Sequence, residues 1–222
     1  MELCDYIDDL GSGSRTVTKV VSQAKRRGRV SVFVDGEFAF GLSDEVAARH
    51  GIRPGVAIDR LLLEPVNRDE AVASCKSTAL RYLSYRMRSE REIRRRLAKD
   101  GAAPEAIDAV LSNLCEIGLV DDDVFAKAFA RDAAITRKWG PHRIARGLRQ
   151  AGVDPDAVEH ALAEVRHELE DQDAVRTLAA KRWDQLSGVN DLIRRKKRVY
   201  DYLLRKGFDY DEIRRAVDSL SS

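Results

Sequence analysis

Three stretches of the chain carry many cationic side chains and few anionic ones. Residues 86–99, 137–149 and 194–206 hold seven, five and seven Lys and Arg, against two, none and one Asp and Glu. Many of these cations are arginines, whose planar guanidinium group can donate two parallel hydrogen bonds to a phosphate or a carboxylate. The chemistry that these residues offer is recognition of an anionic partner, either a nucleic-acid backbone or an acidic protein groove.

Helical periodicity places many of these cations on one face. With Ile93 and Leu97 taken as the buried side, a rotation of about 100° per residue directs Arg95 away from the core. A cationic face can serve solubility alone, but mixed charges would do so equally well, and one sign recurs in all three stretches. We therefore predict a binding surface made of Arg86, Arg88, Arg91, Arg95, Lys99, Arg143, Arg146, Arg149, Arg194, Lys197 and Arg205.

An internal repeat places these stretches in equivalent positions. Residues 93–111 align without gaps on residues 144–162 and on residues 199–217, and their apolar positions coincide. A glycine follows an i, i+4 apolar pair in each copy, where a helix closes its last turn with a left-handed residue. These glycines are Gly101, Gly152 and Gly207. Each repeat therefore predicts three helices, and the cationic stretch is the second of them.

Helix-start signals support this division into helices. Ser89 and Glu92 form a capping box before the second helix of the first repeat. Asp154 is a cap residue before the third helix of the second repeat, and Asp209 forms a capping box with Glu212 at the same place in the third. Apolar helical stretches predict the first helices at 71–86, 124–135 and 175–186.

The segment before the repeats predicts a small α+β domain. Apolar and β-branched residues at 16–24, 30–34 and 37–42 indicate a three-stranded meander. Asp35-Gly36 between the last two strands is a strong hairpin signal, because glycine accepts a positive φ. The basic tip between the first two strands, residues 25–29, could touch a phosphate backbone or be a solvated turn, and we assign it no function.

Two further features complete the N-terminal prediction. Ser43 can cap a short helix, and a brief helical segment is expected after Asp59, interrupted by Pro65. The first residues are acidic and lead to Gly11-Ser12-Gly13-Ser14, which reads as a flexible joint. We therefore expect a flexible tail over residues 1–14.

The predicted fold is mainly α, an elongated tandem array of three three-helix repeats preceded by a small α+β domain with a three-stranded β meander. The expected divisions are a tail at 1–14, a β-rich domain at 15–66, and repeats at 67–119, 120–170 and 171–222.

Other residue types give little support for catalysis, metals or membranes. Cys4, Cys75 and Cys115 are far apart without a Cys-x-x-Cys pair, and the four histidines lack metal-ligand spacing. There is no Gly-rich phosphate loop and no Ser, His and acid set in a recognisable order. Asp121-Asp122-Asp123 fits the charged start of a helix better than a metal cluster. We expect no enzyme activity, metal or cofactor, no membrane span, and a cytoplasmic location.

The turn around Gly101 resembles that of a helix-turn-helix DNA-binding protein, in which the helix after the turn enters the major groove. That helix is acidic in the first two repeats, with Glu105 and Asp108 in one and Asp156 and Glu159 in the other. These carboxylates would face phosphates, so base reading by this helix is disfavoured. Trp139 and Trp183 could stack on bases, but packing beside a helix end is the more common role.

Several motifs resemble those of the bacterial RecX family. The run ALRYLSYRMRSEREIRRRL at 79–97 is similar to the family's first unit. Residues 118–122 leading to Phe125-Ala126, and residues 140–144 leading to Leu148 and Gly152, are similar as well. The resemblance covers about residues 70–165 and continues more loosely through the third repeat. The sequence departs from the common pattern at Met87, where many relatives have Pro.

The resemblance implies a regulator of the RecA recombinase. RecX-like proteins bind the RecA–DNA filament, limit its growth and reduce strand exchange and co-protease activity, and they bind single- and double-stranded DNA. Carried onto this sequence, the contact surface is the basic second helices, and a monomer is expected. The alternative is a sequence-independent DNA-binding or architectural protein that acts on duplex or single-stranded DNA.

Overall fold

The structure, a computed structural model, describes residues 3–10, 13–24, 26–166 and 172–220. The chain divides into two compact units. One contains residues 1–86 and 93–117, and the other contains residues 87–92 and 118–222. The division passes through the second helix of the first repeat.

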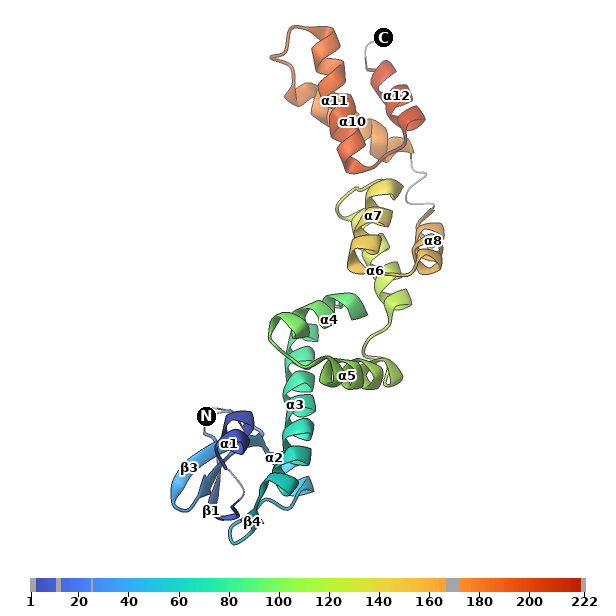
Figure 1. Cartoon of the computed structure of the whole chain (residues 1–222). Helices are drawn as coiled ribbons and strands as arrows, with labels where there is room; N and C mark the ends of the chain where they lie inside the picture. Colours follow the sequence, from blue (N-terminus) through green and yellow to red (C-terminus); the bar gives the residue numbers. More distant parts are fainter. Residues whose placement is uncertain (1–2, 11–12, 25, 167–171, 221–222) are drawn as a thin grey trace. The chain divides into compact units, whose positions relative to one another are not determined.

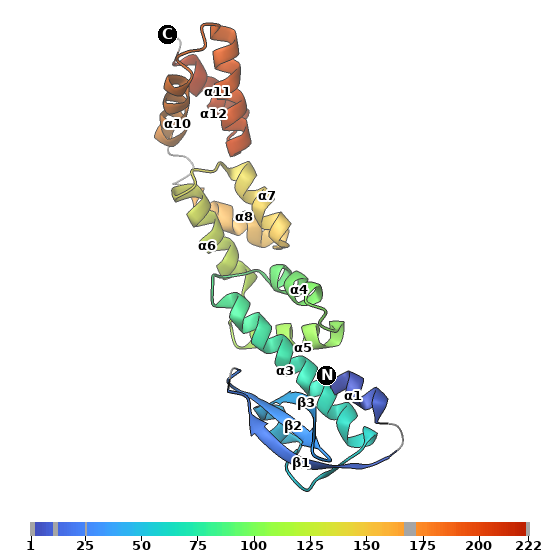
Figure 2. The same ribbon diagram turned by 90° about the vertical axis from the view of Figure 1, so that its left-hand side faces the viewer.

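The first unit contains a four-stranded antiparallel sheet (Figures 1 and 2). Strands β1 (Arg15–Ser22), β2 (Arg29–Val34) and β3 (Glu37–Ser43) form the predicted meander, and β4 (Ala57–Ile58) pairs with the start of β1 to give the order β3-β2-β1-β4. A strand of two residues is too short to show an alternating apolar pattern, so β4 was not predicted. Asp35 and Gly36 have φ values of 51° and 93°, as their hairpin turn requires.

The start of the chain is a helix that packs on the sheet. Helix α1 (Leu3–Asp9) buries Leu3, Tyr6 and Ile7, and the rings of Tyr6 and Phe40 lie 5.1 Å apart. The prediction of a flexible tail over residues 1–14 is therefore wrong for residues 3–10. The three buried residues have helical i, i+3, i+4 spacing, which the acidic residues between them obscured.

Helix α2 (Asp44–Arg49) follows β3, and helix α3 (Arg60–Leu83) follows β4 and continues through Pro65. The prediction that Pro65 interrupts the helix is wrong. A proline inside a helix costs about 3 kcal/mol, but Leu63 and Val66 beside it are fully buried, and each such side chain contributes about 1.5–3 kcal/mol. The predicted boundary after residue 66 falls within this unbroken helix.

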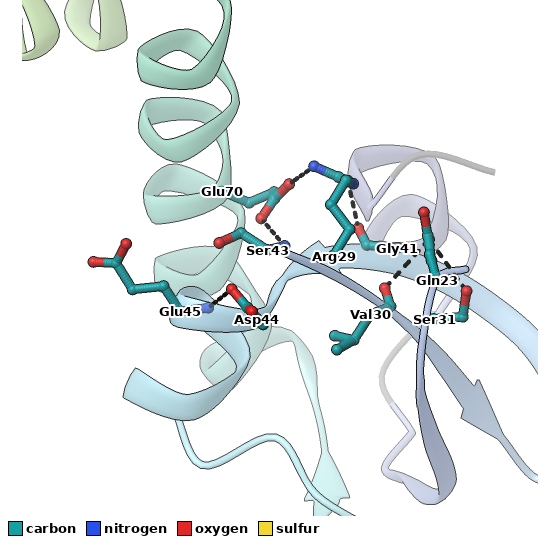
Figure 3. A network of polar contacts seen from close by, with 9 residues as sticks. All are labelled: Gln23, Arg29, Val30, Ser31, Gly41, Ser43, Asp44, Glu45 and Glu70. Carbon is teal, nitrogen blue, oxygen red and sulfur yellow. Dashed lines mark hydrogen bonds and ion pairs between the residues drawn. The ribbon is translucent and has the colours of Figure 1, made fainter. Parts of the chain in front are cut away.

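A buried carboxylate fastens α3 to the sheet (Figure 3). Glu70 is 8% exposed and forms an ion pair of 2.7 Å with Arg29 of β2. Its second oxygen accepts the backbone N–H of Ser43 at 2.7 Å. Ser43 precedes α2 as predicted, but its side chain makes no capping bond there. Helix α3, which supplies the first helix of the first repeat, thus also packs against the sheet of the N-terminal domain.

The three-helix repeats are present as predicted. In the first, α3 is followed by α4 (Glu90–Lys99) and α5 (Pro104–Glu116). The second repeat contains α6 (Asp122–Ile135), α7 (Pro141–Ala151) and α8 (Pro155–Glu164). The third contains α10 (Gln172–Gln185), α11 (Leu192–Lys206) and α12 (Tyr210–Asp218). The aligned residues Ile93, Ile144 and Val199 are all fully buried.

The predicted helix ends are mostly confirmed. The second helix of every repeat is followed by a left-handed glycine, with φ values of 84°, 87° and 89° at Gly101, Gly152 and Gly207. Asp154 accepts a hydrogen bond from the backbone of Asp156. At α12 the predicted capping box is not confirmed, because the side chain of Asp209 makes no capping hydrogen bond.

Among the helices of the described residues, none is long and apolar enough to cross a membrane.

Candidate partner-binding surface

In the second unit, the start of one second helix meets the end of the next. Ser89, directly before α4, donates its hydroxyl to the carbonyl of Ala151 at 2.6 Å, and Ala151 is the last residue of α7. Gly140, directly before α7, donates its N–H to the carbonyl of Lys206 at 2.8 Å, and Lys206 is the last residue of α11. The alignment makes the two donors equivalent and the two acceptors equivalent. We call these contacts the α4–α7 junction and the α7–α11 junction.

Each junction satisfies a carbonyl that a helix end would otherwise leave without a partner. It also sets the positive end of one helix dipole on the negative end of the next, which is favourable. The contact depends on glycine. A Cβ atom at Gly152 would overlap the side chain of Arg91, and one at Gly207 would overlap the backbone of Arg143. At Gly101 a Cβ atom would meet nothing within 4 Å, so only its φ requires glycine there.

In the first unit, α4 carries cations without a carboxylate partner in the described chain on one face and cations in ion pairs beside it. Arg95 and Lys99 are exposed, and neither has a carboxylate within 4 Å among the residues that the structure describes. Arg94 instead forms an ion pair with Asp108 of α5, and Arg96 forms one of 3.0 Å with Asp100. Carboxylates therefore neutralise the cations beside the predicted face and leave the face itself positive.

The second unit holds the larger share of the predicted surface. Six of its predicted cations are exposed and have no carboxylate within 4 Å in the described part of the chain. They are Arg91, Arg146, Arg149, Arg194, Lys197 and Arg205. The α4–α7 junction brings Arg91 of α4 against Gly152, whose N–H is bonded to the carbonyl of Arg149. The junction therefore places Arg91 of α4 at the end of α7, the helix that carries Arg146 and Arg149.

Three predicted residues occupy other surroundings. Arg86 is exposed in the turn between α3 and α4. Arg88 is half-buried, with one nitrogen 3.8 Å from Glu92. Arg143 is half-buried, lies 4.1 Å above the ring of Trp139, and donates to the carbonyl of Arg205 at 3.1 Å. Arg88 and Arg143 therefore have structural contacts whatever else they bind.

The two tryptophans are engaged by arginines. Arg137 and Arg143 lie 5.1 Å and 4.1 Å from the ring of Trp139. Arg195 lies 4.0 Å from the ring of Trp183 and donates two hydrogen bonds to the carbonyl of that residue. These contacts favour the packing interpretation of both rings.

Sequence reasoning missed the residues that join successive repeats. Lys206 donates to the carbonyl of Arg137 at 2.8 Å, and His142 pairs with Asp209 at 2.7 Å. A helical period reports which face of a helix is buried, but it does not report which residue of a later repeat lies opposite. The alignment of Gly140 with Ser89 was the available signal, because both precede a second helix.

The acidic run at the start of α6 caps helices. Asp121 accepts the N–H of Val124 at 2.9 Å, and Asp122 accepts the N–H of Glu90, at the start of α4, at 2.8 Å. Burial raises the pKa of Asp122. Within the described residues, no group of three or more His, Cys, Asp or Glu side chains is arranged to hold a metal ion.

The chain matches four family models. The first, second and third three-helix domains of RecX match residues 75–114, 121–162 and 169–217, and the N-terminal domain of regulatory protein RecX matches residues 15–59. The chain is 31% identical to regulatory protein RecX of Leuconostoc citreum over 93% of its own length and 77% of that protein. It is 30% identical to the Bacillus subtilis protein of the same name over 92% and 76%, respectively.

Solved structures agree with these matches. A crystal structure of regulatory protein RecX superposes with a TM-score of 0.69 at 27% identity, covering 92% of this chain and 99% of the other. The crystal structure of RecX from Lactobacillus salivarius gives 0.59 at 26% identity, covering 69% and 98%. With its N-terminal domain and all three helical repeats matched, the chain belongs to the RecX family of regulatory proteins.

Proposed function

We propose that this protein binds the RecA nucleoprotein filament through the basic faces of α4, α7 and α11, and thereby limits filament growth, strand exchange and co-protease activity. The proposal is that of a regulator without catalytic activity, acting in the cytoplasm as a monomer. Family membership supports the regulatory role, and the charge distribution supports the binding surface.

The observation that carries the proposal is the recurrence of unpaired cations on second helices. Arg95 on α4, Arg146 on α7 and Arg205 on α11 are exposed and lack carboxylate partners in the described chain. The same helices place other cations, such as Arg94, in ion pairs with acidic residues. A surface meant only for solubility has no reason to leave one face positive in each repeat.

The alternative function is sequence-independent binding to DNA itself, with any effect on RecA arising from competition for DNA. The two functions predict different salt dependence. Binding dominated by phosphate contacts releases counterions from the DNA, and this release gains less entropy as the salt concentration rises. Affinity therefore falls by a factor of about 10³–10⁵ between 50 and 200 mM salt for six to ten phosphate contacts.

The experiment compares inhibition of RecA with binding to bare DNA. RecA-catalysed ATP hydrolysis and strand exchange are measured with the protein at less than one molecule per ten RecA subunits, while most of the DNA remains uncovered by it. Inhibition at this ratio is the expected result. If inhibition appears only when enough protein is present to coat the DNA, the architectural function replaces the regulatory one.

A further inference from the structure

Two cations at the α7–α11 junction lie close together without a carboxylate partner. Arg143 belongs to the first turn of α7, and Lys206 is the last residue of α11. Both are half-buried. No Asp or Glu oxygen lies within 4 Å of either cation among the residues that the structure describes.

Neutral groups hold both side chains in place. The guanidinium of Arg143 lies 4.1 Å from the ring of Trp139 and donates one hydrogen bond to the carbonyl of Arg205. The ammonium of Lys206 donates to the carbonyl of Arg137 at 2.8 Å and lies 6.0 Å from the ring of Tyr202. Arg143 and Lys206 keep donors that these contacts leave available, because a guanidinium has five N–H groups and an ammonium has three.

The nearby carboxylates are committed to other partners. Asp209 pairs with His142 at 2.7 Å, and Asp132 pairs with Arg137 at 2.7 Å. Burial lowers the pKa of Lys206, and the charge of Arg143 lowers it further. The two cations therefore repel one another in a partly desolvated place, which is unfavourable until an anion joins them.

We propose that Arg143 and Lys206 form a clamp for one phosphate group, and that this group belongs to a nucleic-acid backbone. A phosphodiester has two unesterified oxygens, so each cation can take one of them with a charge-assisted hydrogen bond. Exposed cations continue from the clamp along both helices, at Arg146 on α7 and at Arg205 on α11. This continuation fits a polyanion better than a single free phosphate.

The choice of nucleic acid rests on the proposed function, while the clamp itself rests on the junction geometry. Lys206→Gln tests the clamp because glutamine removes the charge and keeps a polar side chain. Lys181→Gln is the matched control, since Lys181 is exposed on α10 of the same repeat and lies outside the predicted surface. Thermal unfolding of both variants verifies that they fold.

Binding to single-stranded DNA is then measured as a function of salt. Loss of one phosphate contact reduces the slope of log affinity against log salt by about 0.7. We expect this reduction for Lys206→Gln and an unchanged slope for Lys181→Gln. Equal slopes for Lys206→Gln and the unmodified protein would overturn the proposal.

A second measurement identifies the source of the anion. NMR measures the pKa of the Lys206 ammonium in the free protein. The measurement is repeated with inorganic phosphate, with single-stranded DNA and with poly-glutamate. A pKa raised by DNA is the expected result. A pKa raised only by inorganic phosphate, or only by poly-glutamate, would overturn the assignment to nucleic acid, and a pKa unmoved by all three would overturn the clamp. The phosphate arm remains informative even if the protein fails to regulate RecA, so the two proposals fail separately.

Discussion

The α4–α7 and α7–α11 junctions occupy equivalent positions in the repeat but are built from different donors. At the first, a side-chain hydroxyl, that of Ser89, satisfies the last carbonyl of the next second helix. At the second, the backbone N–H of Gly140 does so. The repeat therefore preserves the position of a hydrogen-bond donor and not its residue type. It also makes the first junction the one that loss of a single side chain can open.

Alanine substitutions at the glycines that follow the second helices should show the largest differences in stability. Alanine at position 207 must adopt a positive φ, which costs about 1–2 kcal/mol of stability. Its Cβ must also displace the backbone of Arg143, which costs about 1–3 kcal/mol more. At Gly152 the obstacle is the flexible side chain of Arg91, and at Gly101 there is none. We expect the loss of stability to fall in the order Gly207→Ala, Gly152→Ala, Gly101→Ala.

Urea unfolding of the three alanine variants measures this order. If Gly101→Ala is as destabilising as Gly207→Ala, the positive φ alone explains the glycines. The junction contacts would then have no part in their requirement.

Ser89→Ala should open the α4–α7 junction at a smaller cost. The hydroxyl of Ser89 is fully buried, donates to Ala151 and also accepts the N–H of Glu92 as a helix cap. Its loss leaves both groups without this partner and should cost about 1–3 kcal/mol. Differential scanning calorimetry compares it with Ser84→Ala, where the serine is exposed and its hydroxyl donates to the carbonyl of Arg81. Equal melting temperatures would mean that Ser89 does not hold the junction.

The smallest expected effect concerns pH and the carboxylate of Asp122, which caps the start of α4. Burial raises the pKa of Asp122, which accepts the N–H of Glu90, so the folded protein binds a proton more readily than the unfolded chain. The contribution of Asp122 to stability is therefore greatest in acid, and it declines as the pH rises from the unfolded pKa of about 3.9 through the folded one.

Asp122→Asn keeps an acceptor for the N–H of Glu90 and removes the buried charge. We expect the variant to be more stable than the unmodified protein at pH 7 and equally stable at pH 3, measured by urea unfolding at both values. A variant less stable at pH 7 would mean that the charge of Asp122 supports the start of α4 more than burial opposes it.

The sequence predicted what depends on local pattern. The 3.6-residue period and the aligned glycines gave the second and third helices of each repeat, and Asp35-Gly36 gave the hairpin. Residues whose local signal conflicts with their tertiary surroundings were predicted wrongly. Pro65 remains inside α3 because Leu63 and Val66 are buried beside it.

The candidate surface was predictable as a set of positions and not as a set of contacts. Helical rotation alone placed Arg95 and Arg146 outward, and both are exposed. Rotation within one helix could not reveal that Arg143 packs on Trp139 or that Lys206 reaches the carbonyl of Arg137. Those contacts depend on how one repeat stacks on the next.

The most direct test of the proposed binding surface reverses its charge. A variant with Arg95, Arg146 and Arg149 replaced by Glu alters only exposed cations of α4 and α7. The control variant has Glu in place of Arg81, Arg131 and Lys181, which are exposed cations of the first helices. The net charge of the protein therefore changes equally in both variants. Inhibition of RecA-catalysed strand exchange should be lost by at least tenfold in the first variant and retained in the control. Equal inhibition by the two variants would contradict the assignment of the second helices as the contact surface.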